Sequence, residues 1–141
     1  MNLWSGSREG HGLAAALTNP TELSFKKGTV HHHDPVRFRR ADDPNAEAAY
    51  RAWKERVGWR DLPALEALVT EMIACKLQQH PRLRQAIATR GGVPWLATCR
   101  HHTSARPTSF QRWEGVGHQS AFIRALIAAY EHVQGGVSCT S

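Results

Sequence analysis

Apolar residues between positions 65 and 77 recur three and four places apart, which is the spacing of one face of an α-helix. Asp61 precedes this run as an N-cap, and Pro63 lies in the first turn, where a proline does no harm. The pattern predicts a long helix that ends near Gln79-His80. Its predicted buried face carries Leu65, Leu68, Val69, Met72, Ile73 and Leu77.

A second helical pattern begins just after two candidate caps, Asp43 and Asn45, and ends at Gly58. Its predicted buried face carries Ala46, Ala49, Tyr50 and Trp53. Glu47 lies at the edge of that face. Its simplest role is a surface ion pair with Arg51, four residues later.

Shorter elements surround these two helices. Pro81 begins a third helix that ends at Gly91-Gly92, and a last helix runs from about Gln119 to His132. Short strands are predicted at 2–5, 23–26, 29–33, 36–39 and 93–99. With no repeat and no linker, the sequence predicts one compact, mainly helical α+β domain over residues 1–134, followed by a loose tail at 135–141.

The composition agrees with a folded domain and indicates the cell compartment in which to expect it. Apolar residues make up 41% of the chain and five are tryptophans, which is typical of a globular protein. No apolar run is long enough to span a membrane, and no secretory signal is evident. The three cysteines are scattered and odd in number, so we expect no disulfide framework and a cytoplasmic location.

The formal net charge of +6 favours phosphorylated or nucleic-acid ligands. This charge is spread along the chain, and only Arg37 to Arg40 form a dense basic patch. His31-His32-His33 invites a metal site, but adjacent residues of a strand point to opposite faces and cannot all bind one ion. We therefore expect no metal at these histidines.

The most informative segment for chemistry runs from Arg112 to Ser120. Trp113 could stack on a base, and Gly115 and Gly117 would let a ligand approach the backbone at the start of a helix. Free N–H groups at a helix start attract phosphate. The alternative is a tight turn whose tryptophan packs in the core.

Five segments resemble, in order, motifs of the NADAR (YbiA-like) family, which is associated with riboflavin biosynthesis. The most specific match is Ala74 to Arg84, which is similar to the family's Ala-Lys-Phe-x-Gln helix pair. The others are Asn2 to Ser5 with Ser7, Leu17 to Pro20, Glu47 to Lys54, and Trp113 with Gly115 and Gly117.

The resemblance implies a compact α+β fold and hydrolysis of a ribosyl N-glycosidic bond without a cofactor. The implied substrates are ADP-ribosylated guanine, including guanine in DNA, and phosphoribosylated amino-pyrimidines. The family's essential glutamate corresponds to Glu47. Its second carboxylate, an aspartate, falls here on Phe110, so this group has either moved to Glu114 or is absent.

The resemblance also implies a set of substrate-binding residues. Trp113 and Tyr50 would stack on the leaving base, Lys54 or Arg51 would meet phosphate, and Trp59 would replace a family tryptophan. The set is completed by Asn19, Gly115, Gly117 and Ser120. The function that the sequence favours is therefore that of an N-glycosidase, as in antitoxins that reverse ADP-ribosylation. The alternative is a catalytically silent module that binds ADP-ribose or nucleic acid.

Overall fold

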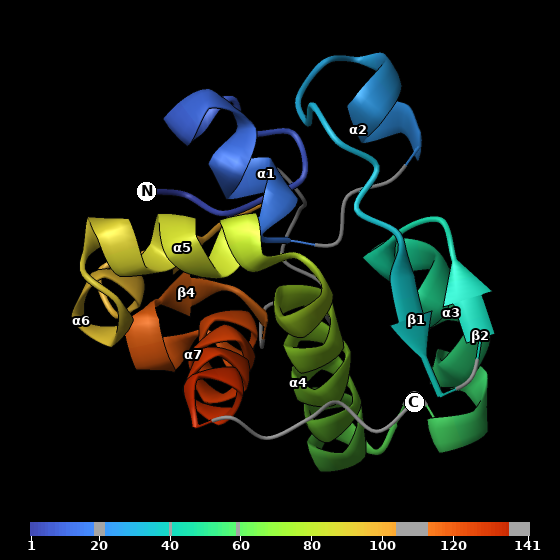
Figure 1. Ribbon diagram of the computed structural model, residues 1–141. Coiled ribbons are helices and arrows are strands. Elements are labelled where there is room, and N and C mark those ends of the chain that lie inside the picture. Colours follow the sequence, from blue (N-terminus) through green and yellow to red (C-terminus); the bar gives the residue numbers. More distant parts are fainter. Residues whose placement is uncertain (19–21, 40, 59, 104–112, 136–141) are drawn as a thin grey trace.

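A computed structural model describes residues 1–18, 22–39, 41–58, 60–103 and 113–135. Helices dominate these residues, and two small antiparallel sheets of short strands accompany them (Figure 1), which confirms the α+β class. In chain order the elements are a 3₁₀ turn Glu9–Gly12, α1 Leu13–Ala16, α2 Glu22–Lys26, β1 Val36–Phe38, β2 Ala41–Asp43, α3 Ala46–Val57, α4 Leu62–Gln79, α5 Pro81–Arg90, α6 Val93–Leu96, β3 Arg100–His101, β4 Gly115–Val116, a 3₁₀ turn Gly117–Gln119 and α7 Ala121–Gln134.

Helix α4 lies at the centre of the molecule. It packs along α7 on one side and against α3 and the β1–β2 hairpin on the other (Figure 1). Two hydrophobic clusters result, and α4 contributes to both. Val69, Ile73 and Leu77 face the larger cluster with α7, while Leu65, Leu68 and Met72 face the smaller cluster with Phe38 and Ala49.

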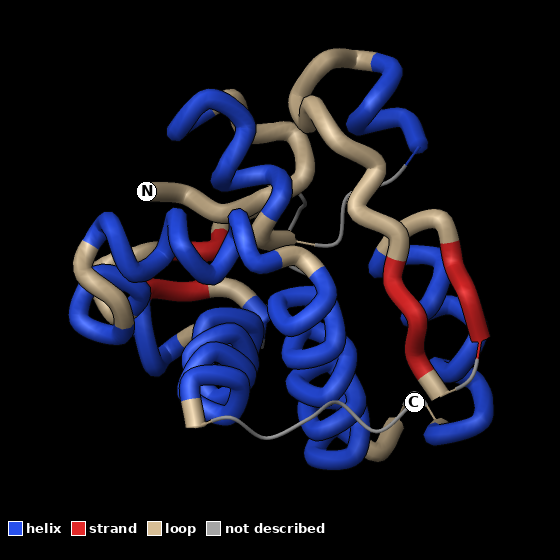
Figure 2. The backbone as a smooth tube through the Cα atoms, in the orientation of Figure 1, coloured by secondary structure: helices blue, strands red, loops and turns tan. Residues whose placement is uncertain are grey.

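The two sheets lie in different parts of the fold (Figure 2). Strands β1 and β2 form a hairpin in which Val36 pairs with Asp43. Strands β3 and β4 bring distant segments together, because Arg100 pairs with Val116 and His101 with Gly115. The N-terminal segment joins this second sheet through a single bridge between Asn2 and Arg100.

The predicted helix starts are confirmed by their capping side chains. The Asn45 side chain accepts from the Ala48 N–H at 2.9 Å, and the Asp61 side chain accepts from the Ala64 N–H at 3.2 Å. The hydroxyl of Ser120 caps α7 by accepting from the Ile123 N–H at 3.2 Å. Each cap binds one of the N–H groups that a helix start leaves without a partner.

Several of the predicted short strands are wrong. Residues 23–26 belong to α2, and residues 93–96 form α6, which begins after Gly92 with Pro94 in its first turn. Residues 2–5 make only the isolated bridge of Asn2, and residues 29–33 belong to no strand. In runs this short, periodicity cannot separate a strand from one helical turn, and the flanking glycine and proline decide.

The expectation for the cysteines holds only in part. Cys99 is a buried free thiol, whereas Cys75 in α4 is disulfide-bonded. Within the described segments, no helix combines the length and the apolar character needed to cross a membrane. Residues 136–141, most of the predicted tail, lie outside the described residues.

Lys76 is a charged residue at the centre of the fold and is only 1% exposed. Its ammonium donates to the carbonyl oxygens of Ala16 and, at 2.7 Å, of Thr18. Burial lowers the pKa of Lys76 to about 8, while the nearby Asp34 carboxylate opposes the shift and Arg82 adds to it. Lys76 therefore ties the end of α1 and Thr18 to α4. The two carbonyl bonds offset the desolvation cost only in part, because the pKa remains lowered.

This burial predicts a pH-dependent term in stability. The pKa of Lys76 is about 8 in the folded chain against 10.5 for an ordinary lysine, so between these values the unfolded chain binds more protons. Stability should therefore rise with pH across this window, by up to about 3 kcal/mol at about 1.4 kcal/mol per pKa unit.

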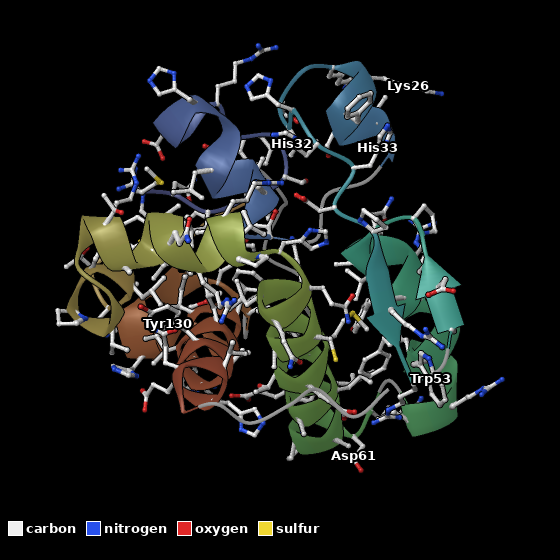
Figure 3. The ribbon with its side chains drawn as sticks, viewed as in Figure 1. Lys26, His32, His33, Trp53, Asp61 and Tyr130 are labelled. Atoms are coloured by element: carbon white, nitrogen blue, oxygen red, sulfur yellow. The ribbon has the colours of Figure 1, made fainter. Side chains whose placement is uncertain are left out.

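Lys76→Met should remove this rise in the free energy of unfolding, measured by urea denaturation between pH 7.5 and 10.5. The matched control is Lys26→Met, because Lys26 extends outward from α2 (Figure 3) and is exposed. It should keep the wild-type slope. Equal slopes in wild type and Lys76→Met would contradict a buried ammonium.

Candidate active site

A cavity of about 360 Å³ lies at the seam between the two hydrophobic clusters. Tyr50 and Trp113 mark this seam, because each packs against both clusters. The cavity is in the size range of small-molecule sites, with mainly apolar and aromatic walls and a few polar groups. Its lining residues are Trp4, Ser5, Thr18, Tyr50, Lys54, Val69, His101, Thr103, Trp113, Glu114 and Phe122.

Trp113 and the turn that follows it are held by local packing. Trp113 lines the cavity, and its carbonyl oxygen accepts from the fully buried Ser120 hydroxyl at 2.5 Å. Gly117 has φ +54°, and a Cβ there would meet the Ala97 carbonyl oxygen. Gly115 has φ +135° and lies against the backbone of Gln119 and Ser120. Ser120 and both glycines thus shape the turn, and none of the three lines the cavity.

Glu114 is the carboxylate of the cavity. Its Oε1 accepts from the Thr103 hydroxyl at 2.5 Å and from the Thr103 N–H at 3.0 Å. The hydroxyl bond is the largest influence that lowers the pKa of Glu114, and the backbone bond and the two histidines His101 and His102 act in the same direction. Glu114 therefore stays ionised near neutral pH and offers a fixed negative charge.

Helix α3 contributes one aromatic and one cationic group to the cavity. The Lys54 ammonium lies 5.8 Å from the centre of the Tyr50 ring, within the range of a cation–π contact. Burial and the charge of Glu47 raise the pKa of Tyr50, so its hydroxyl stays protonated and can donate a hydrogen bond. Four of the residues named from the sequence, Tyr50, Lys54, Trp113 and Glu114, line this one cavity.

Glu47 lies outside the cavity lining. Its Oε1 accepts from the Arg51 guanidinium at 3.0 Å across one turn of α3. The Glu47 side chain is 27% exposed and that of Arg51 is 75% exposed. The surface ion pair, the simplest role for Glu47, is thus present, and Arg51 is occupied by it.

Sequence reasoning missed His101, Trp4 and Thr18 as cavity residues. The His101 ring lies 4.7 Å from that of Phe122, and its Nδ1 is 2.5 Å from the Leu3 carbonyl oxygen. Burial is the main cause that lowers the pKa of His101. The pairing of β3 with β4 brings His101 beside Glu114, and no local pattern in the sequence announces that pairing.

The histidine run lies in another part of the molecule. His32 and His33 lie in the segment that leads from α2 to β1 (Figure 3), and His33 stacks on Phe25. Among the described residues, no three histidine, cysteine, aspartate or glutamate side chains cluster in a way that could hold a metal ion. Asn19, Trp59 and Phe110, named from the sequence, lie outside the described residues.

Comparison with known proteins adds no relative: no protein-family model, no curated protein and no solved structure matches the chain. The resemblance to the NADAR family therefore stays a prediction from the motifs.

The Thr103 contacts predict how the Glu114 carboxyl titrates. Thr103→Val removes the hydroxyl donor and keeps the backbone N–H, so the pKa of Glu114 should rise toward its ordinary value. Carboxyl ¹³C NMR titration of Glu114 measures this change. Thr98→Val is the control, because the Thr98 hydroxyl donates to its own turn at the Trp95 carbonyl. An unchanged titration in Thr103→Val would contradict the assigned hydrogen bond.

The turn glycines predict a difference in stability. Gly117→Ala combines a positive φ with a clash against Ala97, whereas Gly28→Ala has a positive φ of +73° with no atom near the added Cβ. Gly28→Ala should cost about 1 kcal/mol, and Gly117→Ala about 1–3 kcal/mol more. Urea denaturation measures both. Equal losses of stability in the two variants would contradict the predicted clash between a side chain at position 117 and Ala97.

Proposed function

We propose that the protein is an N-glycoside hydrolase that cleaves the ribosyl C–N bond of an ADP-ribosylated nucleobase, such as ADP-ribosyl-guanine in DNA, or of a phosphoribosylated amino-pyrimidine. The observation that carries this proposal is the Glu114 carboxyl group, held by two hydrogen bonds from Thr103 in the lining of an aromatic cavity. The motif resemblance supplies the reaction class. The cavity supplies groups that suit its chemistry.

The transition state of ribosyl C–N cleavage carries positive charge on the anomeric carbon and ring oxygen. A fixed carboxylate beside that carbon stabilises the charge. Glu114 meets this need because its hydrogen bonds favour the ionised form. It suits the role of electrostatic stabiliser better than that of proton donor.

The other cavity groups suit the two ends of such a substrate. Trp113 and Tyr50 provide aromatic faces on which a nucleobase can stack. Lys54 provides the charge for a phosphate of the ribosyl moiety. The volume of about 360 Å³ suits the ribosyl-base unit, with the remaining phosphate groups at the cavity mouth.

One observation favours the second candidate, a catalytically silent ADP-ribose binding module. Glu47, the essential glutamate implied by the resemblance, is tied to Arg51 and does not line the cavity. If the reaction required Glu47 in the site, this arrangement would bind a ligand without cleaving it.

The test is release of free ADP-ribose from an oligonucleotide that carries ADP-ribosyl-guanine, with a ribosylamino-pyrimidine phosphate assayed in parallel. Wild type should turn over at least one of the two. Glu114→Gln should lower kcat roughly 100-fold or more with a small change in KM, because it removes charge stabilisation in the transition state. Glu47→Gln, a matched loss of one carboxylate charge on α3, should lower kcat less than about fivefold.

Thermal unfolding of both variants controls for folding. Tight binding of ADP-ribose without turnover by wild type would support the silent module. Loss of activity in Glu47→Gln with full activity in Glu114→Gln would place the reaction at Glu47 and contradict the proposed site.

A further inference from the structure

The position of His101 suggests how the proposed reaction activates its water molecule. The proposed hydrolase needs a nucleophilic water, and a group must take a proton from that water as it attacks the sugar. Glu114 is a weak base for this step, because the two hydrogen bonds from Thr103 occupy Oε1 and lower its pKa. Among the described side chains that line the cavity, His101 supplies an imidazole, the side chain that most often acts as a general base.

The surroundings of His101 fix its protonation pattern. Its Nδ1 lies 2.5 Å from the Leu3 carbonyl oxygen, which can only accept, so Nδ1 carries the hydrogen. In a neutral imidazole the other nitrogen, Nε2, then has the free electron pair. The ring also lies against that of Phe122, with the ring centres 4.7 Å apart and the planes tilted by 30°, and this contact restricts its orientation.

The sheet pairing places this histidine next to the carboxylate. His101 pairs with Gly115 across the β3–β4 ladder, and Glu114 directly precedes Gly115. Both side chains line the same cavity. The pairing of β3 with β4 thus places a carboxylate and an imidazole in the lining of one cavity.

We propose that Nε2 of His101 binds the nucleophilic water and takes its proton as the water attacks the anomeric carbon. The water oxygen forms the new C–O bond, and its proton moves to Nε2. The C–N bond breaks, its electron pair goes to the nitrogen of the base, and that nitrogen takes up a proton from solvent. His101 then returns its proton to solvent, so the net reaction is addition of one water across the C–N bond.

This inference rests on the proposed hydrolase function, and it has a pH signature. Burial lowers the pKa of His101, against the opposing influences of the Leu3 carbonyl and Glu114, while His102 adds to the lowering. Phe122 and Leu3, which also contact the ring, do not titrate. The acid limb of kcat/KM should therefore lie below the ordinary histidine value of 6.5, and activity should fall as the pH falls through the His101 pKa.

Three variants separate the loss of the proposed base from a loss of structure. His101→Asn keeps a donor near the position of Nδ1, within reach of the Leu3 carbonyl, and lacks Nε2. It should fold like wild type and lose roughly 100-fold or more in kcat with little change in KM, and its acid limb should disappear. His102→Asn, which changes an exposed neighbour, should keep activity within about twofold of wild type. His101→Gly should regain activity when imidazole is added, because the cavity admits it.

One further measurement tests the role of His101 independently of whether the protein hydrolyses a substrate. Long-range ¹⁵N NMR reads the tautomer of His101 directly, with and without ADP-ribose. An unprotonated Nε2 at pH 7 whose shift changes on ligand addition is the expected result. A protonated Nε2, or no change with bound ADP-ribose, would overturn the inference even if wild type hydrolyses no substrate. Turnover by wild type and His101→Asn alike would overturn it while leaving the hydrolase function intact.

Discussion

The burial of α4 on two faces is the constraint on which the rest of the structure depends. Residues 65 to 77 are apolar on both sides, so the helix must be covered by α7 on one side and by α3 with the hairpin on the other. Two clusters form where a small domain would otherwise have one core. The seam between them cannot be filled by α4 alone, and the large rings of Tyr50 and Trp113 close it only partly. The cavity is therefore a consequence of how the helices pack.

The same arrangement includes a buried lysine in α4. The Lys76 ammonium binds the carbonyl oxygens of Ala16 and Thr18, and Thr18 also lines the cavity. Ala16 is the last residue of α1 and Thr18 lies just beyond it, and carbonyls at a helix end need a donor from elsewhere. Lys76 supplies that donor from α4. Stability and the shape of the candidate site thus share one interaction.

Much of the fold follows from local sequence, and much of the site does not. Asn45 and Asp61 mark helix starts that the structure confirms, because a cap acts within three residues. The strand predicted at 93–99 is wrong. Residues 93–96 form a helical turn, which Gly92 and Pro94 favour and which the apolar pattern alone does not indicate. Tyr50, Lys54, Trp113 and Glu114 were expected near one another and line one cavity. His101 also lines this cavity, because strand pairing brings it next to Gly115, which is distant in the sequence. Glu47 does not line it and forms an ion pair with Arg51, four residues later.

The central claim is that chemistry occurs in the cavity at Glu114, away from Glu47 on the outer edge of α3. A crystal structure with ADP-ribose soaked in tests this most directly, because the position of the anomeric carbon identifies the carboxylate it faces. The account predicts the ribose inside the cavity, with its anomeric carbon beside Glu114 and one ordered water on Nε2 of His101. A ribose bound at the Glu47–Arg51 pair, with the cavity empty, would contradict it.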